Sequence, residues 1–192
     1  MILLTAVASG LLAGLLRAMV RGRRLTSLNL RLLWLVVIAF IPQLLAFNLP
    51  ATRARLPDQA ASAALILSQV MLQVFAWANR RQPGFWALGV GLALNLLVIA
   101  ANGGWMPVSP DTVRVLIPSA PAGSWVIGQR LGFGKDIVLP VPETRLWFLS
   151  DCLLLPAWVP CRVAFSVGDV FIALGAFYAL WALAGSQKKS TH

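Results

Sequence analysis

Charged side chains are scarce in this sequence. Lysine, arginine, aspartate and glutamate together make up 11% of its 192 residues, whereas hydrophobic residues make up 59%. Soluble domains usually devote about a quarter of their residues to charge. This composition argues against a water-soluble fold and predicts an integral membrane protein.

Residues that bind metals or nucleotides are also few. The chain has one histidine, at its last position, and two cysteines, Cys152 and Cys161, which is too few for the three or four converging ligands of a zinc site. Residues 128–136 resemble a phosphate-binding loop, but Gln129 and Asp136 occupy the positions of its first glycine and of its serine or threonine. We therefore predict no metal, no nucleotide and no other cofactor.

What the sequence does have is a series of apolar stretches. At about 1.5 Å per residue, a helix of about 20 residues crosses a hydrocarbon core of roughly 30 Å. We therefore expect an all-α polytopic membrane protein with about five transmembrane helices, the second of them kinked at Pro42. The expected helices cover residues 1–20, 32–49, 60–78, 84–101 and 164–184.

Basic and acidic residues fall at opposite ends of these helices. The basic groups in question are Arg17, Arg21, Arg23, Arg24, Arg31, Arg80, Arg81, Lys188 and Lys189. The acidic residues are Asp58, Asp111, Asp136, Glu143, Asp151 and Asp169. Since basic loops stay in the cytoplasm, this pattern predicts a multi-pass protein of the cell inner membrane, with an extracytoplasmic N-terminus and a cytoplasmic C-terminus. Trp34, Trp77, Trp86 and Trp181 fall near the same inner boundary.

The net charge of +10 does not indicate a nucleic-acid partner. Such a partner needs basic residues gathered on one solvated face with aromatic residues between them, and these are distributed over separate loops.

The one long connection, residues 102–163, holds most of the twelve prolines. Its apolar pieces are too short to span a membrane and too rich in proline for long helices. We expect an extracytoplasmic cap, and the sequence leaves open whether it contains short β-strands or is compact without them. The chain is thus divided into a four-helix transmembrane region (1–101), the proline-rich cap (102–163), and the fifth helix with a basic cytoplasmic tail (164–192).

The two cysteines lie in the expected cap, where a disulfide can persist. A bridge between Cys152 and Cys161 would stiffen the loop before the last helix. The alternative is a pair of small buried thiols, and the sequence leaves both open because it does not give the geometry of the two side chains.

Polar and small residues within the apolar stretches are interpreted as packing features. Gln69, Gln73 and Asn95 each need a partner in lipid, for which an interhelical hydrogen bond is the expected solution. Gly10 and Gly14 are spaced to let two helices approach closely.

Asp169 stands out because it is an ionisable residue at the outer end of an apolar helix. A carboxylate in such a place suggests a functional site. The alternative is a structural role, since Ser166 and Asp169 both sit where the free N–H groups and the positive dipole end of the first helical turn would stabilise them.

Three segments, residues 102–108, 145–151 and 165–175, make the sequence resemble a known family. They read Asn-Gly-Gly-Trp-Met-Pro-Val, Arg-Leu-Trp-Phe-Leu-Ser-Asp and Phe-Ser-Val-Gly-Asp-Val-Phe-Ile-Ala-Leu-Gly. In this order they resemble a bacterial inner-membrane family catalogued as a domain of unknown function. The resemblance covers nearly the whole chain and implies an inner-membrane protein with no established activity.

A fainter likeness is to signal peptidase II, whose last helix begins with Phe-Asn-x-Ala-Asp followed by Ile-x-x-Gly. Phe165, Gly168 and Asp169 are similar in placement, although Ser166 replaces the asparagine and the Gly-Asn-x-x-Asp-Arg segment of that family is absent. The likeness implies an aspartyl peptidase in which Asp151 and Asp169 form a catalytic dyad that shares a proton. Asn102, Gly103 and Gly104 would then bind the substrate.

We therefore predict a non-catalytic accessory, scaffolding or assembly subunit, with an aspartyl peptidase acting at the outer leaflet as the alternative. The expected partners are the lipid bilayer and other membrane-protein subunits, and the sequence leaves the oligomeric state open.

Overall fold

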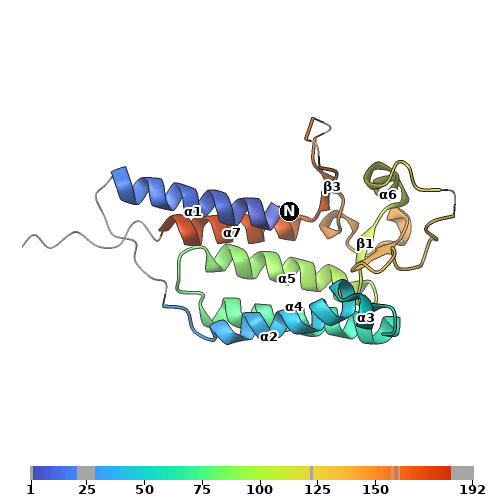
Figure 1. Ribbon diagram of the computed structural model, residues 1–192, viewed down its shortest axis with the longest axis horizontal. Coiled ribbons are helices and arrows are strands. Elements are labelled where there is room, and N and C mark those ends of the chain that lie inside the picture. The colour runs from blue at the N-terminus through green and yellow to red at the C-terminus, as the bar shows by residue number, and fades with distance from the viewer. Residues whose placement is uncertain (1, 21–28, 122, 157, 160, 183–192) are drawn as a thin grey trace, which may run out of the picture.

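The computed structural model describes residues 2–20, 29–121, 123–156, 158–159 and 161–182 (Figure 1). Part of the predicted basic set lies outside the described residues, and so does the end of the expected cytoplasmic tail. These basic residues are Arg21, Arg23, Arg24, Lys188 and Lys189.

Five long helices run side by side, and each runs in the opposite direction to the one before it along the chain (Figure 1). They are α1 (Ile2–Val20), α2 (Leu33–Gln43), α4 (Asp58–Ala78), α5 (Phe85–Ala101) and α7 (Val167–Ala182). Their neighbours in space are α1 with α7, α7 with α5, α5 with α4, and α4 with α2. The last helix therefore lies between the first and the fourth long helices, and the mostly helical fold expected from the sequence is confirmed.

The second helix changes its geometry just after Pro42, where a kink was expected. Pro42 is the penultimate residue of α2, and the chain continues as a π-helical turn, η1 (Leu44–Asn48). A proline removes one hydrogen-bond donor from the helical ladder, which favours such a local change of winding. A short helix, α3 (Pro50–Arg53), then leads to α4.

Helix length supports one membrane span and does not by itself establish five. The 21-residue helix α4 is long and apolar enough to cross a bilayer, and among the described residues it alone meets both criteria. The other apolar helices, Thr5–Val20, Leu33–Asn48, Phe85–Ala101 and Val167–Ala182, have 10–17 residues. At about 1.5 Å per residue, 17 residues cover about 26 Å, a little less than a hydrocarbon core.

Glycines allow α5 and α7 to pack in backbone contact. A Cβ atom on Gly91 would collide with the carbonyl oxygen of Gly168, and one on Gly175 would lie 2.5 Å from the backbone nitrogen of Leu88. The predicted packing role of Gly10 is also confirmed, since a Cβ there would lie 2.9 Å from the Cα of Phe177 on α7.

The cap sits at one end of the helices and contains short strands, which is one of the two alternatives that the sequence leaves open (Figure 1). Strand β1 (Met106–Val108) pairs in parallel with β2 (Asp136–Val138), and β3 (Leu153–Leu154) pairs antiparallel with β4 (Ala164–Phe165). The remaining elements are the helix α6 (Pro110–Leu116) and two 3₁₀ turns, η2 (Val141–Glu143) and η3 (Trp147–Leu149). Val108, Val113 and Val138 form its small buried core.

Arg130 joins the cap to the helices. Its side chain is 7% exposed, and Nη2 donates to the carbonyl oxygen of Ala46 in the π-helical turn at 3.2 Å. The guanidinium also lies over the rings of Phe47 and Trp105, 5.1 and 5.0 Å from their centroids. Nη1 also forms an ion pair with Asp58 at the start of α4, at 3.4 Å, so Arg130 joins the cap to the π-helical turn and to α4.

Candidate functional site

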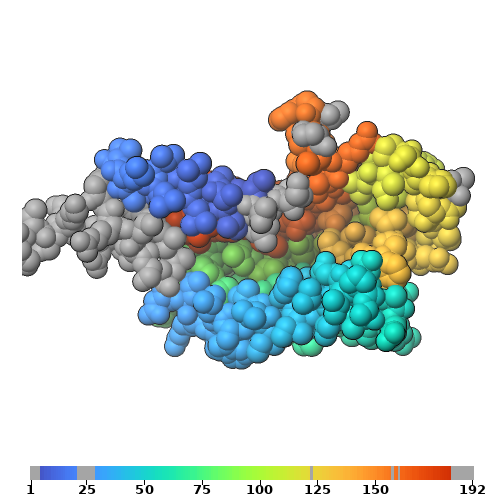
Figure 2. Space-filling model, in the orientation of Figure 1, coloured from blue at the N-terminus to red at the C-terminus, as the bar shows by residue number. Residues whose placement is uncertain are grey.

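A cavity of about 530 Å³ lies where the helices meet the cap. Its wall is built by α2, α4, α5 and α7 together with cap residues 135–136, 151 and 163–165. Figure 2 shows that α1 and α2 stand apart on one face of the molecule, with α5 and α7 visible between them. Three of the helices that border this hollow, α2, α5 and α7, contribute to the cavity wall.

The cavity has a polar end and an apolar end. Gln43, Gln69, Asn95, Lys135, Asp136, Asp151 and Asp169 supply the polar groups. The apolar groups come from Val36, Leu72, Phe75, Leu88, Leu92 and Ile172, together with Val163, Ala164 and Phe165 of the cap. Because the first six of these apolar residues lie on the long helices, most of the apolar wall is on the side away from the cap.

Asp169 serves as a helix cap, as the structural alternative predicts. The backbone N–H of Asp169 donates to Ser166 Oγ at 3.0 Å, and the backbone N–H of Ser166 donates to Asp169 Oδ2 at 3.1 Å. These reciprocal bonds form a capping box at the start of α7. The other carboxylate oxygen, Oδ1, accepts a 2.9 Å bond from Nδ2 of Asn95 on α5.

Asn95 has the interhelical partners that its position in an apolar helix requires. Besides donating to Asp169, it accepts a 2.7 Å bond from Ser166 Oγ through its Oδ1. Asn95 is 4% exposed, so this network links α5 to the first turn of α7 within the protein interior. The hydrogen bond expected for Asn95 is confirmed.

Asp151 belongs to the cap and is 5% exposed. Its backbone N–H donates to the carbonyl oxygen of Pro107 in β1, which places the side chain beside β2. Lys135 Nζ donates to Asp151 Oδ2 at 2.6 Å and to Asp136 Oδ1 at 3.1 Å. Asp151 Oδ1 is buried and has no hydrogen-bond partner in the described part of the chain.

Burial and neighbouring charges shift the pKa values of both Asp151 and Lys135. Burial raises the pKa of Asp151 to about 6; the Lys135 ammonium opposes the shift, and the negative charges of Asp136 and Asp169 add to it. Burial alone would lower the pKa of Lys135, but the carboxylates of Asp136 and Asp151 outweigh it and raise that pKa. Lys135 is therefore protonated at neutral pH, and Asp151 titrates closer to neutral pH than an ordinary aspartate does.

The two aspartates of the suggested dyad line the same cavity but have separate partners. Asp151 is bound to Lys135, and Asp169 is bound to Asn95 and Ser166. A shared proton between the two carboxyl groups stays a prediction.

Asn102, Gly103 and Gly104 form the turn that ends α5 and are not among the cavity-lining residues. Asn102 Oδ1 accepts from the backbone N–H of Arg145 at 3.0 Å, and its Nδ2 donates to the Arg145 carbonyl oxygen at 2.9 Å. Gly103 and Gly104 have φ angles of +73° and +88°, which favour glycine. The geometry gives this segment a structural role, and its binding of a substrate stays a prediction.

Cys152 and Cys161 are free thiols in the structure and each is half-buried. Burial raises the pKa of the Cys152 thiol, the backbone hydrogen bond of the residue opposes this, and the Asp151 charge adds to it. Within the described ranges, no group of three or more histidine, cysteine, aspartate or glutamate residues is arranged to hold a metal ion.

Sequence reasoning missed Lys135, Asp136 and Gln43 as members of the site. A lysine next to an aspartate in a glycine-flanked loop was considered only as a failed phosphate-binding motif. The parallel pairing of β1 with β2 places Asp136 opposite Met106, and this long-range register is what brings the lysine to Asp151. Gln43 is bound to Ser68 through a 2.6 Å hydrogen bond from its Nε2.

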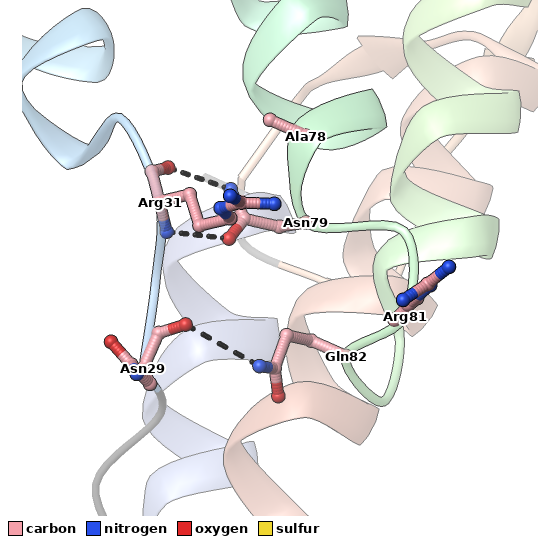
Figure 3. Close-up of a pocket in the computed structure, with 6 residues that line it drawn as sticks. All are labelled: Asn29, Arg31, Ala78, Asn79, Arg81 and Gln82. Atoms are coloured by element: carbon pink, nitrogen blue, oxygen red, sulfur yellow. Dashed lines mark hydrogen bonds between the residues drawn. The ribbon is translucent and has the colours of Figure 1, made fainter.

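The opposite end of the helices carries a smaller cavity, of about 250 Å³, at the turn between α4 and α5 (Figure 3). Asn79 accepts from the backbone N–H of Arg31 at 2.7 Å and donates to the Arg31 carbonyl oxygen at 2.8 Å. Gln82 Nε2 donates to the carbonyl oxygen of Asn29 at 3.4 Å. These bonds join the segment that enters α2 to the α4–α5 turn, which indicates a structural junction.

Comparison with known proteins places the chain among proteins of unknown function. A family model described as "Family of unknown function (DUF5317)" matches residues 27–181. An uncharacterized protein of Thermotoga maritima is 28% identical over 155 residues, which cover 78% of this chain and 73% of the relative. No solved structure matches the chain. These findings give no support to the likeness to signal peptidase II. Because the family match covers most of the chain, the chain belongs to the DUF5317 family of unknown function.

Proposed function

We propose that this protein is a multi-pass protein of the bacterial inner membrane with five spanning helices, an extracytoplasmic cap and a non-catalytic role as an accessory or assembly subunit. The observation that carries the membrane proposal is the exposed apolar surface on every long helix. Leu12 of α1, Val37 of α2, Leu67 of α4, Trp86 of α5 and Leu174 of α7 are each more than half exposed. Soluble monomers rarely expose apolar surface on such a scale, whereas lipid covers it at no cost.

Aromatic and basic side chains at the end away from the cap support the proposed orientation. The guanidinium of Arg17 lies 3.9 Å from the ring centroid of Trp181, and that of Arg80 lies 4.6 Å from the ring centroid of Trp77. Tryptophan is enriched at both membrane interfaces, whereas arginine is enriched in cytoplasmic loops, so the tryptophans support an interface at this end and the arginines its cytoplasmic side. Helices of 16 or 17 residues fit a bilayer that thins slightly around the protein, which costs fractions of a kcal/mol per Å.

The bonding of the two cavity aspartates supports a non-catalytic role. Oδ1 of Asp169 is bound to Asn95 on α5 and Oδ2 caps the start of α7, and one oxygen of Asp151 is bound to Lys135. An aspartyl dyad needs two carboxyl groups close enough to share a proton. The bonds in this site instead join elements of the fold.

Rescue of a deletion strain tests the role. The Asp169→Asn variant keeps the shape of the capping residue but can accept only one of its two hydrogen bonds, so we expect a modest loss of stability, of about 1 kcal/mol. At equal protein level, it should rescue the strain as well as the unchanged protein does. Complete loss of rescue with a normal amount of folded variant in the membrane would contradict the non-catalytic proposal.

A peptidase acting at the outer leaflet is the second candidate, because Asp151 and Asp169 line one cavity and the pKa of Asp151 is raised toward the range of a general acid. On this account, purified protein in lipid vesicles cleaves lipid-modified peptides, and both Asp151→Asn and Asp169→Asn abolish cleavage without loss of folding. Absence of cleavage by the unchanged protein would reject it.

A further inference from the structure

We propose that the 530 Å³ cavity binds a single-chain amphiphile with a positively charged amine headgroup, the ammonium lying at the cap end and the alkyl chain along the helices. This inference goes beyond the proposed function and rests on the lining of the cavity.

The order of polar and apolar residues is the same on all four helices of the cavity wall. Along α2, Gln43 is nearer the cap than Val36, and along α5, Asn95 is nearer the cap than Leu88 and Leu92. On α4, Gln69 is nearer the cap than Leu72 and Phe75, and on α7, Asp169 is nearer the cap than Ile172. A cavity with this gradient matches a molecule that is polar at one end and apolar along the rest of its length.

The charge of the polar end selects the headgroup. The cavity is lined by three carboxylates, those of Asp136, Asp151 and Asp169, and by one ammonium group, that of Lys135. The site therefore carries an excess of negative charge when all four groups are ionised, which favours a cation and opposes an anionic headgroup.

Two buried acceptors in the wall lack a donor. Asp151 Oδ1 and Gln69 Oε1 have no hydrogen-bond partner within the described residues, and Asp151 is 5% exposed. A buried acceptor without a partner is costly, and a bound ammonium group supplies up to three N–H donors. An alcohol would supply one donor and a carboxylate none.

The volume suits one chain. Small-molecule sites commonly enclose about 300–1,000 Å³ and are mostly apolar with a few placed polar groups.

Native mass spectrometry of the full chain in mild detergent, paired with thermal melting, tests the proposal. The probes are dodecylamine, dodecanoate and ethylamine at equal concentration. We expect one dodecylamine per chain and a higher melting temperature, with no such effect from dodecanoate, which has the wrong charge, or from ethylamine, which lacks the chain. Equal binding of dodecanoate would overturn the charge argument, and equal binding of ethylamine would overturn the role of the apolar wall.

Variants locate the site. Asp151→Asn should weaken dodecylamine binding at least tenfold, because it removes a charge-assisted acceptor. The matched control is Asp111→Asn, which changes an exposed carboxylate of the cap paired with Arg114, and it should bind as the unchanged protein does. Gln69→Leu provides a second test that does not disturb the Lys135 ion pair, and it too should weaken binding. If Gln69→Leu and folded Asp151→Asn protein both bind dodecylamine as tightly as the unchanged protein does, the assignment to this cavity is overturned.

Discussion

At the scale of single residues, the polar side chains of the helices mainly form hydrogen bonds that hold neighbouring elements together. Asn95 makes two hydrogen bonds that connect α5 with the start of α7, one to Asp169 and one to Ser166, and Ser166 Oγ also accepts the Asp169 backbone N–H. In a protein interior without water, each of these groups needs its partner, because an unpaired polar group is costly to bury.

The capping box gives a prediction for Ser166. Ser166→Ala removes the acceptor for the Asp169 backbone N–H and the donor to Asn95 Oδ1, so it should lower the free energy of unfolding by about 1–2 kcal/mol. Thermal melting in detergent measures this. The control is Ser9→Ala, since Ser9 is exposed and its hydroxyl bonds only within its own helix, and a change of equal size there would contradict the prediction.

The raised pKa of Asp151 predicts how stability depends on pH. The pKa is about 6 in the folded protein against an ordinary value of 3.8, because of burial. A raised pKa means that the folded state binds this proton more tightly than the unfolded state does. The protonated carboxyl group therefore stabilises the fold fully below pH 3.8, and this stabilisation is lost as pH rises through about 6. Lys135 stays protonated throughout this window because its pKa is raised as well.

We therefore expect the difference in unfolding free energy between the unchanged protein and Asp151→Asn to change by about 2–3 kcal/mol between about pH 4 and pH 6.5. The unchanged protein should lose stability relative to the variant as pH rises. Melting curves at several pH values measure this, and parallel pH profiles for the two proteins would rule out a titrating Asp151.

At the scale of secondary-structure elements, the contact between α5 and α7 decides the packing. Two glycines of α5, Gly91 and Gly89, allow a matched pair of substitutions that tests this contact. A Cβ on Gly91 would collide with the Gly168 carbonyl oxygen, whereas a Cβ on Gly89 would meet Ala76 Cβ at 3.7 Å, an ordinary contact. Gly91→Ala should therefore destabilise the protein by about 1–3 kcal/mol, while Gly89→Ala should stabilise it by up to about 1 kcal/mol through helix propensity.

Thermal melting in detergent distinguishes these two variants. A Gly91→Ala variant as stable as the unchanged protein would show that α5 and α7 do not approach as closely as the structure indicates.

The junction of cap and helices gives a further prediction. Arg130→Ala removes the hydrogen bond to the Ala46 carbonyl oxygen and the contacts with Phe47 and Trp105, so it should cost about 2–4 kcal/mol. Arg114→Ala is the control, because Arg114 is exposed in an ion pair with Asp111, and exposed pairs contribute only about 0–1 kcal/mol. Limited proteolysis should cut the cap faster in the Arg130 variant only.

The sequence was most informative where apolar stretches end at prolines and glycines. The helix expected at 60–78 is found at Asp58–Ala78, and that expected at 84–101 at Phe85–Ala101, since Pro57 and Gly84 mark their starts. The last helix was expected to begin at residue 164 but begins at Val167. Residues 164 and 165 instead form β4, and apolar composition does not distinguish a strand from the first turn of a helix.

The candidate site was only partly predictable for a related reason. Asp151 and Asp169 were recognised because they are carboxylates beside apolar segments. The partner of Asp151, Lys135, depends on the pairing of β1 with β2, and a pairing between strands of three residues leaves no periodic pattern in the sequence.

At the scale of the whole molecule, the proposed function requires that the cap and the α4–α5 turn lie on opposite sides of a membrane. Asp111, Asp136 and Asp151 lie in the cap, which also contains basic residues, whereas the described residues at the other end include Arg31, Arg80 and Arg81 and no acidic side chain. The native cysteines allow this claim to be tested directly, because both lie in the cap region and the opposite end has none.

Labelling of intact cells with a membrane-impermeant maleimide is the most direct measurement. The reaction is run after mild reduction at about pH 8.5, because the raised pKa of Cys152 leaves little reactive thiolate at neutral pH. The account predicts that the native cysteines are labelled in intact cells, and that an Arg81→Cys variant lacking both native cysteines is labelled only after permeabilisation. Labelling of the Arg81→Cys variant in intact cells, or protection of Cys152 and Cys161 until the membrane is opened, would contradict it.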